Sequence, residues 1–147
     1  MSCCRLAGQS SARKSLTDSS PAEDRHGRPG NAVRRPRYHE AWTAKNFGDA
    51  ASLLAADLHV EVPVNHYPTT ESFAAALESF GSMTTGLALL AEMSAGDEAM
   101  LLYDMEVDGL GRLRVAEHFT VARGKIVRIR QVHDTAALRA AGFAGGG

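Results

Sequence analysis

The sequence lacks most of the features that mark secreted and membrane proteins. Its only cysteines, Cys3 and Cys4, are neighbours near the N-terminus, so they cannot cross-link a folded domain. No apolar run approaches the roughly 18 residues of a membrane helix, and the N-terminus has no apolar segment typical of a secretory signal. These absences predict a soluble, cytoplasmic protein that does not act at a membrane and has no structural disulfide.

Motifs for cofactor and covalent chemistry are missing as well. The sequence has no glycine-rich phosphate loop and no GxSxG nucleophile motif. Five of the six histidines lie in the second part of the sequence, scattered without the spacing or the carboxylate neighbours of a zinc site: His39, His59, His66, His118 and His133. We therefore expect no metal and no cofactor, which leaves cofactor-free chemistry or plain ligand binding.

Charge is distributed unevenly along the chain. Residues 1–37 hold 8 basic and 3 acidic residues, a net charge of +5, whereas residues 38–147 hold 8 and 14, a net charge of −6. An acidic domain argues against nucleic acid as its partner. Residues 1–33 are polar and lack apolar periodicity, which predicts a disordered extension before one folded domain at residues 34–143. A dispensable extension and a basic arm that touches nucleic acid or membrane both fit this composition.

Helices are predicted in the first half of the domain. Tyr38 and Trp42 fall on a helical period in residues 34–45, and a short second helix is expected at 50–55 after an N-cap at Asp49. A short strand at 59–62 follows. A third helix, capped by Thr70 and ended by Gly81, points Phe73, Leu77 and Phe80 in one direction.

Strands dominate the second half. Short polar or glycine-rich breaks separate four predicted strands at residues 87–93, 99–107, 113–121 and 126–133, as in an antiparallel meander. Asp134 is expected to cap a last helix at 135–141, which Gly142 ends. Helices followed by strands predict an α+β fold with the helices gathered on one face of a curved sheet.

Alternation within the last two strands points to a ligand cavity. Residues two apart share a face, which groups Val115, Glu117, Phe119 and Val121 on one side of the first strand. The same rule groups Val127, Ile129, Gln131 and His133 on one side of the second strand. A mostly apolar face that also carries a carboxylate, an amide and an imidazole is typical of a small-molecule pocket.

The chain resembles the NTF2-like superfamily, the cone-shaped α+β domain of ketosteroid isomerases, SnoaL-type polyketide cyclases and limonene epoxide hydrolases. The resemblance covers about residues 37–133 and rests on five motifs: Arg37-Tyr38, Asn46 to Asp49 with the helix of Leu53-Leu54-Ala55, Val60-Glu61-Val62-Pro63, Glu117-His118-Phe119, and Gly124-Lys125-Ile126-Val127. It implies a curved antiparallel sheet with helices packed on its concave face. Such domains commonly dimerise through the outer face of the sheet, where charged residues of both signs are expected here: Arg114, His118, Arg128, Arg130, Asp104 and Glu106.

The resemblance also suggests catalytic roles. In ketosteroid isomerases a helix tyrosine and a protonated strand acid bind the enolate oxygen, and an aspartate before a proline moves the proton. The resemblance places Tyr38 and Glu117 at the first two positions but puts Val62 at the position of the base. Because valine cannot move a proton, His133 is the candidate for the missing base, and we expect Glu117, His133 and Tyr38 to be catalytic.

Further residues are expected to line the pocket: Trp42, Val62, His66, Tyr67, Phe73, Tyr103, Phe119, Ile129 and Gln131. Structural roles compete with these assignments, since aromatic stripes are usually core and a buried acid can belong to an ion pair. Two functions fit the sequence. One is acid–base chemistry of the isomerase, cyclase or hydrolase kind on a small apolar molecule; the other is a non-catalytic ligand-binding or dimerisation module.

Overall fold

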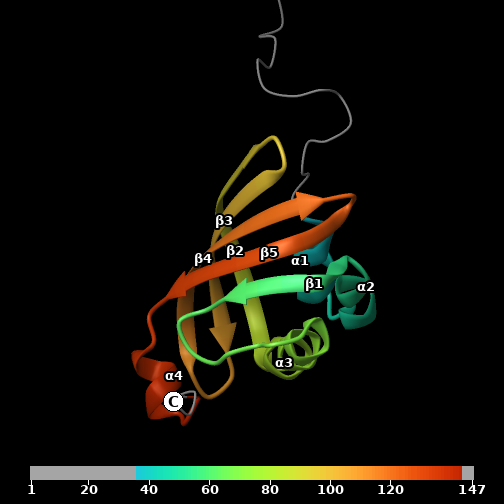
Figure 1. Cartoon of the computed structure of the whole chain (residues 1–147). Helices are drawn as coiled ribbons and strands as arrows, with labels where there is room; N and C mark the ends of the chain where they lie inside the picture. The colour runs from blue at the N-terminus through green and yellow to red at the C-terminus, as the bar shows by residue number, and fades with distance from the viewer. Residues whose placement is uncertain (1–35, 144–147) are drawn as a thin grey trace, which may run out of the picture.

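A computed structural model describes residues 36–143 of the chain, and the predicted N-terminal extension lies outside this range. Within it, the elements follow one another as shown in Figure 1: α1 (Arg37–Thr43), α2 (Phe47–Ser52), β1 (Leu54–Glu61), α3 (Thr70–Met83), β2 (Thr84–Ala95), β3 (Glu98–Val107), β4 (Gly111–Ala122), β5 (Lys125–His133) and α4 (Ala136–Ala140). None of the helices in residues 36–143 is long and apolar enough to span a membrane.

The strands form one mixed sheet in the order β1-β5-β4-β3-β2. Strands β2 to β5 are the predicted antiparallel meander, and β1 joins them by pairing in parallel with β5. The helices α1, α2 and α3 gather against one face of the curved sheet, and α4 lies beyond the end of β5 (Figure 1). This arrangement confirms the α+β fold class.

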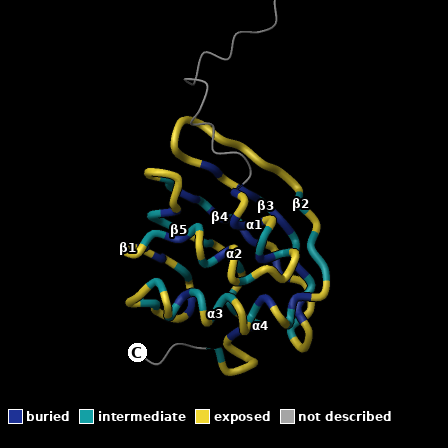
Figure 2. The backbone as a smooth tube through the Cα atoms, turned by 90° about the vertical axis from the view of Figure 1, so that its right-hand side faces the viewer, coloured by how far each residue is buried: buried dark blue, intermediate teal, exposed yellow. Residues whose placement is uncertain are grey.

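Burial alternates along the central strands, as the sequence predicts. Every second residue of β3 is buried, including Leu101, Tyr103 and Met105, and β4 turns Val115 and Phe119 inward in the same way. The residues of β3 and β4 that point outward are more exposed, and β2 is exposed along most of its length (Figure 2). The core therefore lies between this inner face and the helices, while the other face of the sheet meets solvent.

Strand β5 contains a bulge, and this changes which of its residues face the core relative to the prediction. The register with β4 shifts so that Thr120 pairs with Arg128 and Val121 pairs with Ile126, which leaves Val127 as an extra residue. As a result Ile126 is buried, at 3% exposure, and Val127 is only half-buried. The predicted grouping of Val127 with Ile129 is wrong, because strict alternation fails across a bulge.

The helix boundaries also differ from the predicted ones. Helix α2 begins at Phe47, so Asp49 lies inside it, and β1 begins at Leu54, five residues before the predicted start of that strand. Thr69 is the N-cap of α3, where its hydroxyl accepts from the Ser72 N–H and Ser72 reciprocates in a capping box. Helix α4 begins at Ala136 with Thr135 as its N-cap, so Asp134 lies one residue before the predicted cap position, although its Oδ1 accepts from the Ala136 N–H at 2.8 Å.

Gly81 lies inside α3, which continues to Met83, so the prediction that this glycine ends the helix is wrong. A Cβ built at Gly81 would lie 2.6 Å from Cε1 of Phe47, well inside van der Waals contact. The glycine therefore allows α2 and α3 to approach closely. Lys45 supports the same corner, because its Nζ donates to the carbonyl oxygens of Gly81 and Thr84 at the end of α3.

Candidate active site

Two adjoining chambers lie between the inner face of the sheet and the helices. The inner chamber has a volume of about 70 Å³ and the outer one about 210 Å³. Residues of α3, β5 and α4 belong to the walls of both: Leu77, Phe80, Gln131, His133 and Leu138. Since they share these walls, the chambers can be treated as one site with a small inner end and a larger outer end.

The inner chamber contains one buried carboxylate, Glu117 of β4, which is 1% exposed. The Tyr103 hydroxyl donates to its Oε2 at 2.8 Å, and the Gln131 amide donates to its Oε1 at 2.8 Å. Sheet register explains both contacts: Gln131 is the direct partner of Glu117 on β5, and Tyr103 of β3 is its diagonal neighbour. Three adjacent strands thus fix the carboxylate.

The electrostatic state of Glu117 follows from this burial. Desolvation raises the pKa of the carboxyl group from 4.5 to about 7, and the two hydrogen bonds only partly oppose this. Both donors are neutral, so neither compensates a negative charge. Burial likewise raises the pKa of Tyr103 well above 10, so that this hydroxyl stays protonated and donates.

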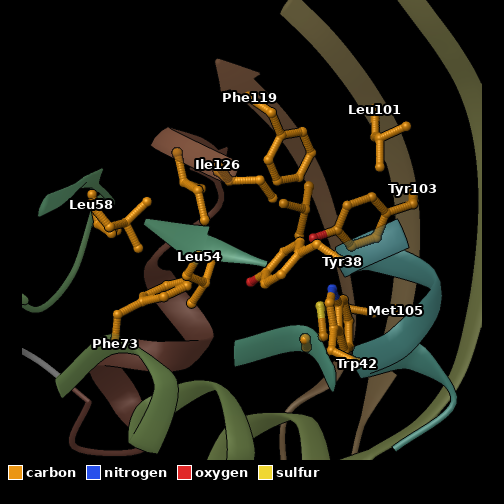
Figure 3. Close-up of a cluster of buried hydrophobic side chains, with 14 of the residues drawn as sticks. Tyr38, Trp42, Leu54, Leu58, Phe73, Leu101, Tyr103, Met105, Phe119 and Ile126 are labelled. Atoms are coloured by element: carbon orange, nitrogen blue, oxygen red, sulfur yellow. The ribbon is translucent and has the colours of Figure 1, made fainter. Parts of the chain in front are cut away.

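Tyr38 approaches the same chamber from α1. Its ring packs edge-on against Phe119 at a centroid distance of 5.8 Å, beside Tyr103 and Trp42 (Figure 3). The Tyr38 hydroxyl is buried and has no hydrogen-bond partner among the described residues. Burial, reinforced by the nearby Glu117, raises its pKa well above 10. A buried hydroxyl costs free energy when it is unpaired, so this group is available to a ligand.

His133 lies at the end of β5, where both chambers meet. Its Nδ1 is 3.0 Å from the carbonyl oxygen of Asp134. Because a carbonyl can only accept, this contact requires the proton on Nδ1 and leaves Nε2 of a neutral ring as an acceptor. The sequence prediction that His133 shares a site with Glu117 and Tyr38 agrees with this placement.

The predicted wall residues divide into two groups. Trp42, Tyr103 and Gln131 line the inner chamber, and Val62, Tyr67 and Phe73 line the outer one. The other three line neither chamber. Phe119 and Ile129 are fully buried core residues, and His66 is exposed in the loop before α3.

The C-terminal end of the domain and helix α3 provide further walls that were not predicted from the sequence. Leu138 of α4 is buried and lines both chambers, and Phe143 lines the outer one and packs edge-on against Phe80. Leu77 and Phe80 could have been found, because they share a helix face with Phe73. No such signal exists for Leu138, since a five-residue helix is too short for periodicity to be read.

Residues 36–143 contain no group of three or more His, Cys, Asp or Glu side chains that could hold a metal ion. The inner chamber itself brings together two groups of a kind that can exchange protons, Glu117 and His133, and one hydroxyl that can form a hydrogen bond, Tyr38. Both are available within apolar surroundings.

A curved sheet that closes with helices over an inner pocket defines the NTF2-like class of α+β domains. The chain belongs to the SnoaL-like domain family of this class, whose family model matches residues 36–129. No curated protein matches it significantly in sequence.

Solved structures support the same fold. A protein from Kribbella flavida is 30% identical, with a TM-score of 0.66 over 71% of this chain and 86% of that one. An NTF2-like protein of unknown function from Cytophaga hutchinsonii is 18% identical, with a TM-score of 0.62 over 69% and 88%. A steroid delta-isomerase from Pseudomonas aeruginosa is also 18% identical, with a TM-score of 0.61 over 72% and 81%.

Proposed function

We propose that this protein binds a small, mostly apolar molecule in the two chambers and carries out acid–base chemistry on it without a cofactor. The observation that supports this is a single buried carboxylate, Glu117, at the inner end of an otherwise largely apolar site. In this arrangement the apolar body of the ligand occupies the outer chamber. Its polar group reaches Glu117 and the unpaired hydroxyl of Tyr38.

Glu117 and His133 are the proposed proton-exchanging pair. A carboxyl with a pKa of about 7 can both donate and accept a proton near neutral pH. His133, whose Nε2 is the acceptor nitrogen of the neutral ring, lines the same chamber. Cofactor-free isomerase, cyclase and hydrolase reactions can proceed by proton transfer through such a pair, and the structural similarity to a steroid delta-isomerase fits this group of reactions.

A non-catalytic binding module is the second candidate, and Val62 favours it. This side chain lines the outer chamber at the position where the related isomerases have their base. A valine there removes the usual proton carrier. On this alternative the chambers hold a ligand without changing it.

The proposed assembly is a homodimer through the outer face of the sheet. Asp104 pairs there with Arg114, and Glu106 with Arg112, so these charges are satisfied within one chain. Met93, Met100 and Val132 share this face and are exposed at 64%, 43% and 69%. A dimer would cover these apolar side chains, with the ion pairs at its rim. Light scattering at tens of micromolar, about the range where such contacts form, should show a dimer for the wild type and a monomer for Val132→Lys.

Ligand binding can be tested by blocking the outer chamber. Ala76 of α3 lines it, whereas the neighbouring Ala75 is exposed, so Ala76→Phe and Ala75→Phe add the same ring inside and outside the site. Trp42, the single tryptophan of the chain, lines the inner chamber, and its fluorescence would follow binding of small bicyclic alcohols, ketones and amines. We expect Ala76→Phe to weaken binding by at least about tenfold, with little change for Ala75→Phe. Failure of every probe to bind the wild type would refute the proposed function.

A further inference from the structure

We propose that the ligand is a lipophilic amine, whose ammonium group enters the inner chamber and pairs with Glu117. This inference rests on the proposed function and names the chemical class of its ligand. Three features of the inner chamber support it: an uncompensated acid, walls of aromatic rings, and a hydroxyl oxygen with no partner.

The acid lacks a positive partner. Among the described residues that line the inner chamber, none is a lysine or an arginine. The donors to Glu117 are a phenol and an amide, which use one lone pair on each carboxylate oxygen and leave the others open. A buried carboxylate is costly without an opposite charge, and a bound ammonium ion would supply one.

Aromatic rings surround the same space. Tyr38, Trp42 and Tyr103 all line the inner chamber with Glu117, and the ring centroids of Trp42 and Tyr103 are 6.4 Å apart. The faces of aromatic rings attract cations, most strongly where water is excluded. Rings around a carboxylate suit an organic cation better than a neutral polar group, which would gain little from them.

The hydrogen-bonding capacity also fits an ammonium ion. Its N–H groups need acceptors, and the inner chamber offers the carboxylate of Glu117 and the unpaired hydroxyl oxygen of Tyr38. The chamber volumes match a two-part ligand. About 70 Å³ is enough for a small head group, and the 210 Å³ of the outer chamber takes an apolar body against Phe73, Tyr67 and Val64.

The affinity for an amine should increase with pH, whereas the affinity for a neutral ligand should not. The ammonium ion prefers ionised Glu117, and a neutral ligand avoids the cost of ionising it. The other titratable groups at the chamber are Tyr38 of α1, Tyr103 of β3 and His133 of β5, while α3 and α4 contribute only apolar side chains and Gly81. His39 of α1 is a further titratable group beside the chamber, because its ring packs edge-on against that of Tyr103 with the centroids 4.8 Å apart. Both tyrosines stay neutral over this range, and the amide variant of Glu117 described below isolates the part of the pH dependence that this carboxyl group contributes.

Calorimetric titration with 2-aminoindane and its matched alcohol, 2-indanol, tests this proposal. At about pH 8 the amine should bind at least about tenfold more tightly than the alcohol, as expected for a charge-assisted contact. Between about pH 8 and pH 6 the affinity for the amine should fall by up to about tenfold, because Glu117 becomes protonated.

Two variants test whether Glu117 is responsible for the preference for the amine and for its pH dependence. Glu117→Gln should reduce the affinity for the amine to that for the alcohol and remove the part of the pH dependence that belongs to the carboxylate. Any slope that remains in this variant does not come from the Glu117 carboxylate. Glu78→Gln removes the same charge from an exposed position of α3 and should change neither ligand's affinity.

Each outcome decides between the proposals. Equal or tighter binding of 2-indanol would overturn the proposal that the ligand is an amine, and so would amine binding that does not weaken on acidification. Either result would leave the proposed ligand-binding function intact. Binding of neither probe overturns both the amine and the proposed function. The wild-type titrations already decide the question if Glu117→Gln does not fold.

Discussion

Glu117 and Asp104 lie on neighbouring strands of the same sheet, one on its inner face and one on its outer face. Arg114 holds Asp104 with two hydrogen bonds of 2.7 and 2.9 Å, and these lower the pKa of that carboxyl group. Glu117 has only neutral donors and is buried, so its pKa is raised to about 7. The outer face thus carries charge that is already compensated, and the inner face carries an acid whose charge is open to a ligand.

The largest expected difference between the two faces concerns packing. Phe119 is fully buried against Tyr38, so Phe119→Ala should lower the free energy of unfolding by about 3–5 kcal/mol. Its neighbour His118 faces outward and lies 3.4 Å from an exposed carboxylate, so His118→Ala should have a much smaller effect. Urea unfolding of both variants measures the difference. Similar losses would mean that packing at His118 contributes as much to stability as packing on the inner face.

The next largest effect is expected from Glu117→Gln at neutral to alkaline pH. Because folding raises the pKa of this carboxyl from 4.5 to about 7, the wild type should lose roughly 3 kcal/mol of stability as the pH rises through this window. The amide carries no charge, so the variant should be about as stable as the wild type near pH 5 and more stable near pH 8. Thermal unfolding at both values measures this. Destabilisation of the variant near pH 8 would instead indicate a structural ion pair at Glu117.

A smaller effect is expected for Tyr103→Phe, which removes one donor to Glu117. The pKa of Glu117 should rise further, and the free energy of unfolding should fall by about 1–2 kcal/mol near pH 8, where the carboxylate is charged. A carbon-13 NMR titration of the carboxyl group measures its midpoint directly. Tyr67→Phe removes a hydroxyl from the outer chamber and serves as the control, with an unchanged midpoint.

The smallest effect is expected for Arg114→Ala on the outer face. The pair with Asp104 is solvent-exposed on the arginine side, so its loss should be minor and should vanish at high salt. Since pairing lowers the pKa of Asp104, its contribution is present above the ordinary value of 3.8 and is lost as the pH falls further. Unfolding curves at low and high salt measure this. A large, salt-resistant loss would remove the contrast between the two faces.

The sequence predicted the inner face where strand alternation is unbroken. In β3 and β4 no register shift intervenes, so Val115, Glu117 and Phe119 turn inward as expected. In β5 the bulge places Ile126 in the core instead of Val127, which strict alternation would have turned inward. Both are β-branched apolar residues, so their identity cannot reveal which one faces the core.

The sequence predicted part of the residue set that lines the candidate site, but not the contacts among these residues. Alternation places Glu117, Gln131 and His133 on one face, and the resemblance adds Tyr38. The pairing of Glu117 with Tyr103 depends on the register between β3 and β4, which no single sequence specifies. Leu138 of α4 lines both chambers, and its place there depends on tertiary packing alone, so the sequence pattern could not reveal it.

The close approach of Gly81 to Phe47 links two positions that are 34 residues apart in the chain. Any side chain at 81 would overlap the ring at 47, so a larger residue at 81 requires a smaller one at 47. Gly81→Ala should therefore be harmful alone and tolerated together with Phe47→Leu. Across homologous sequences the two positions are expected to covary. Because Gly81 also forms part of the inner chamber, such paired changes offer evolution a route to reshape the site without altering Glu117.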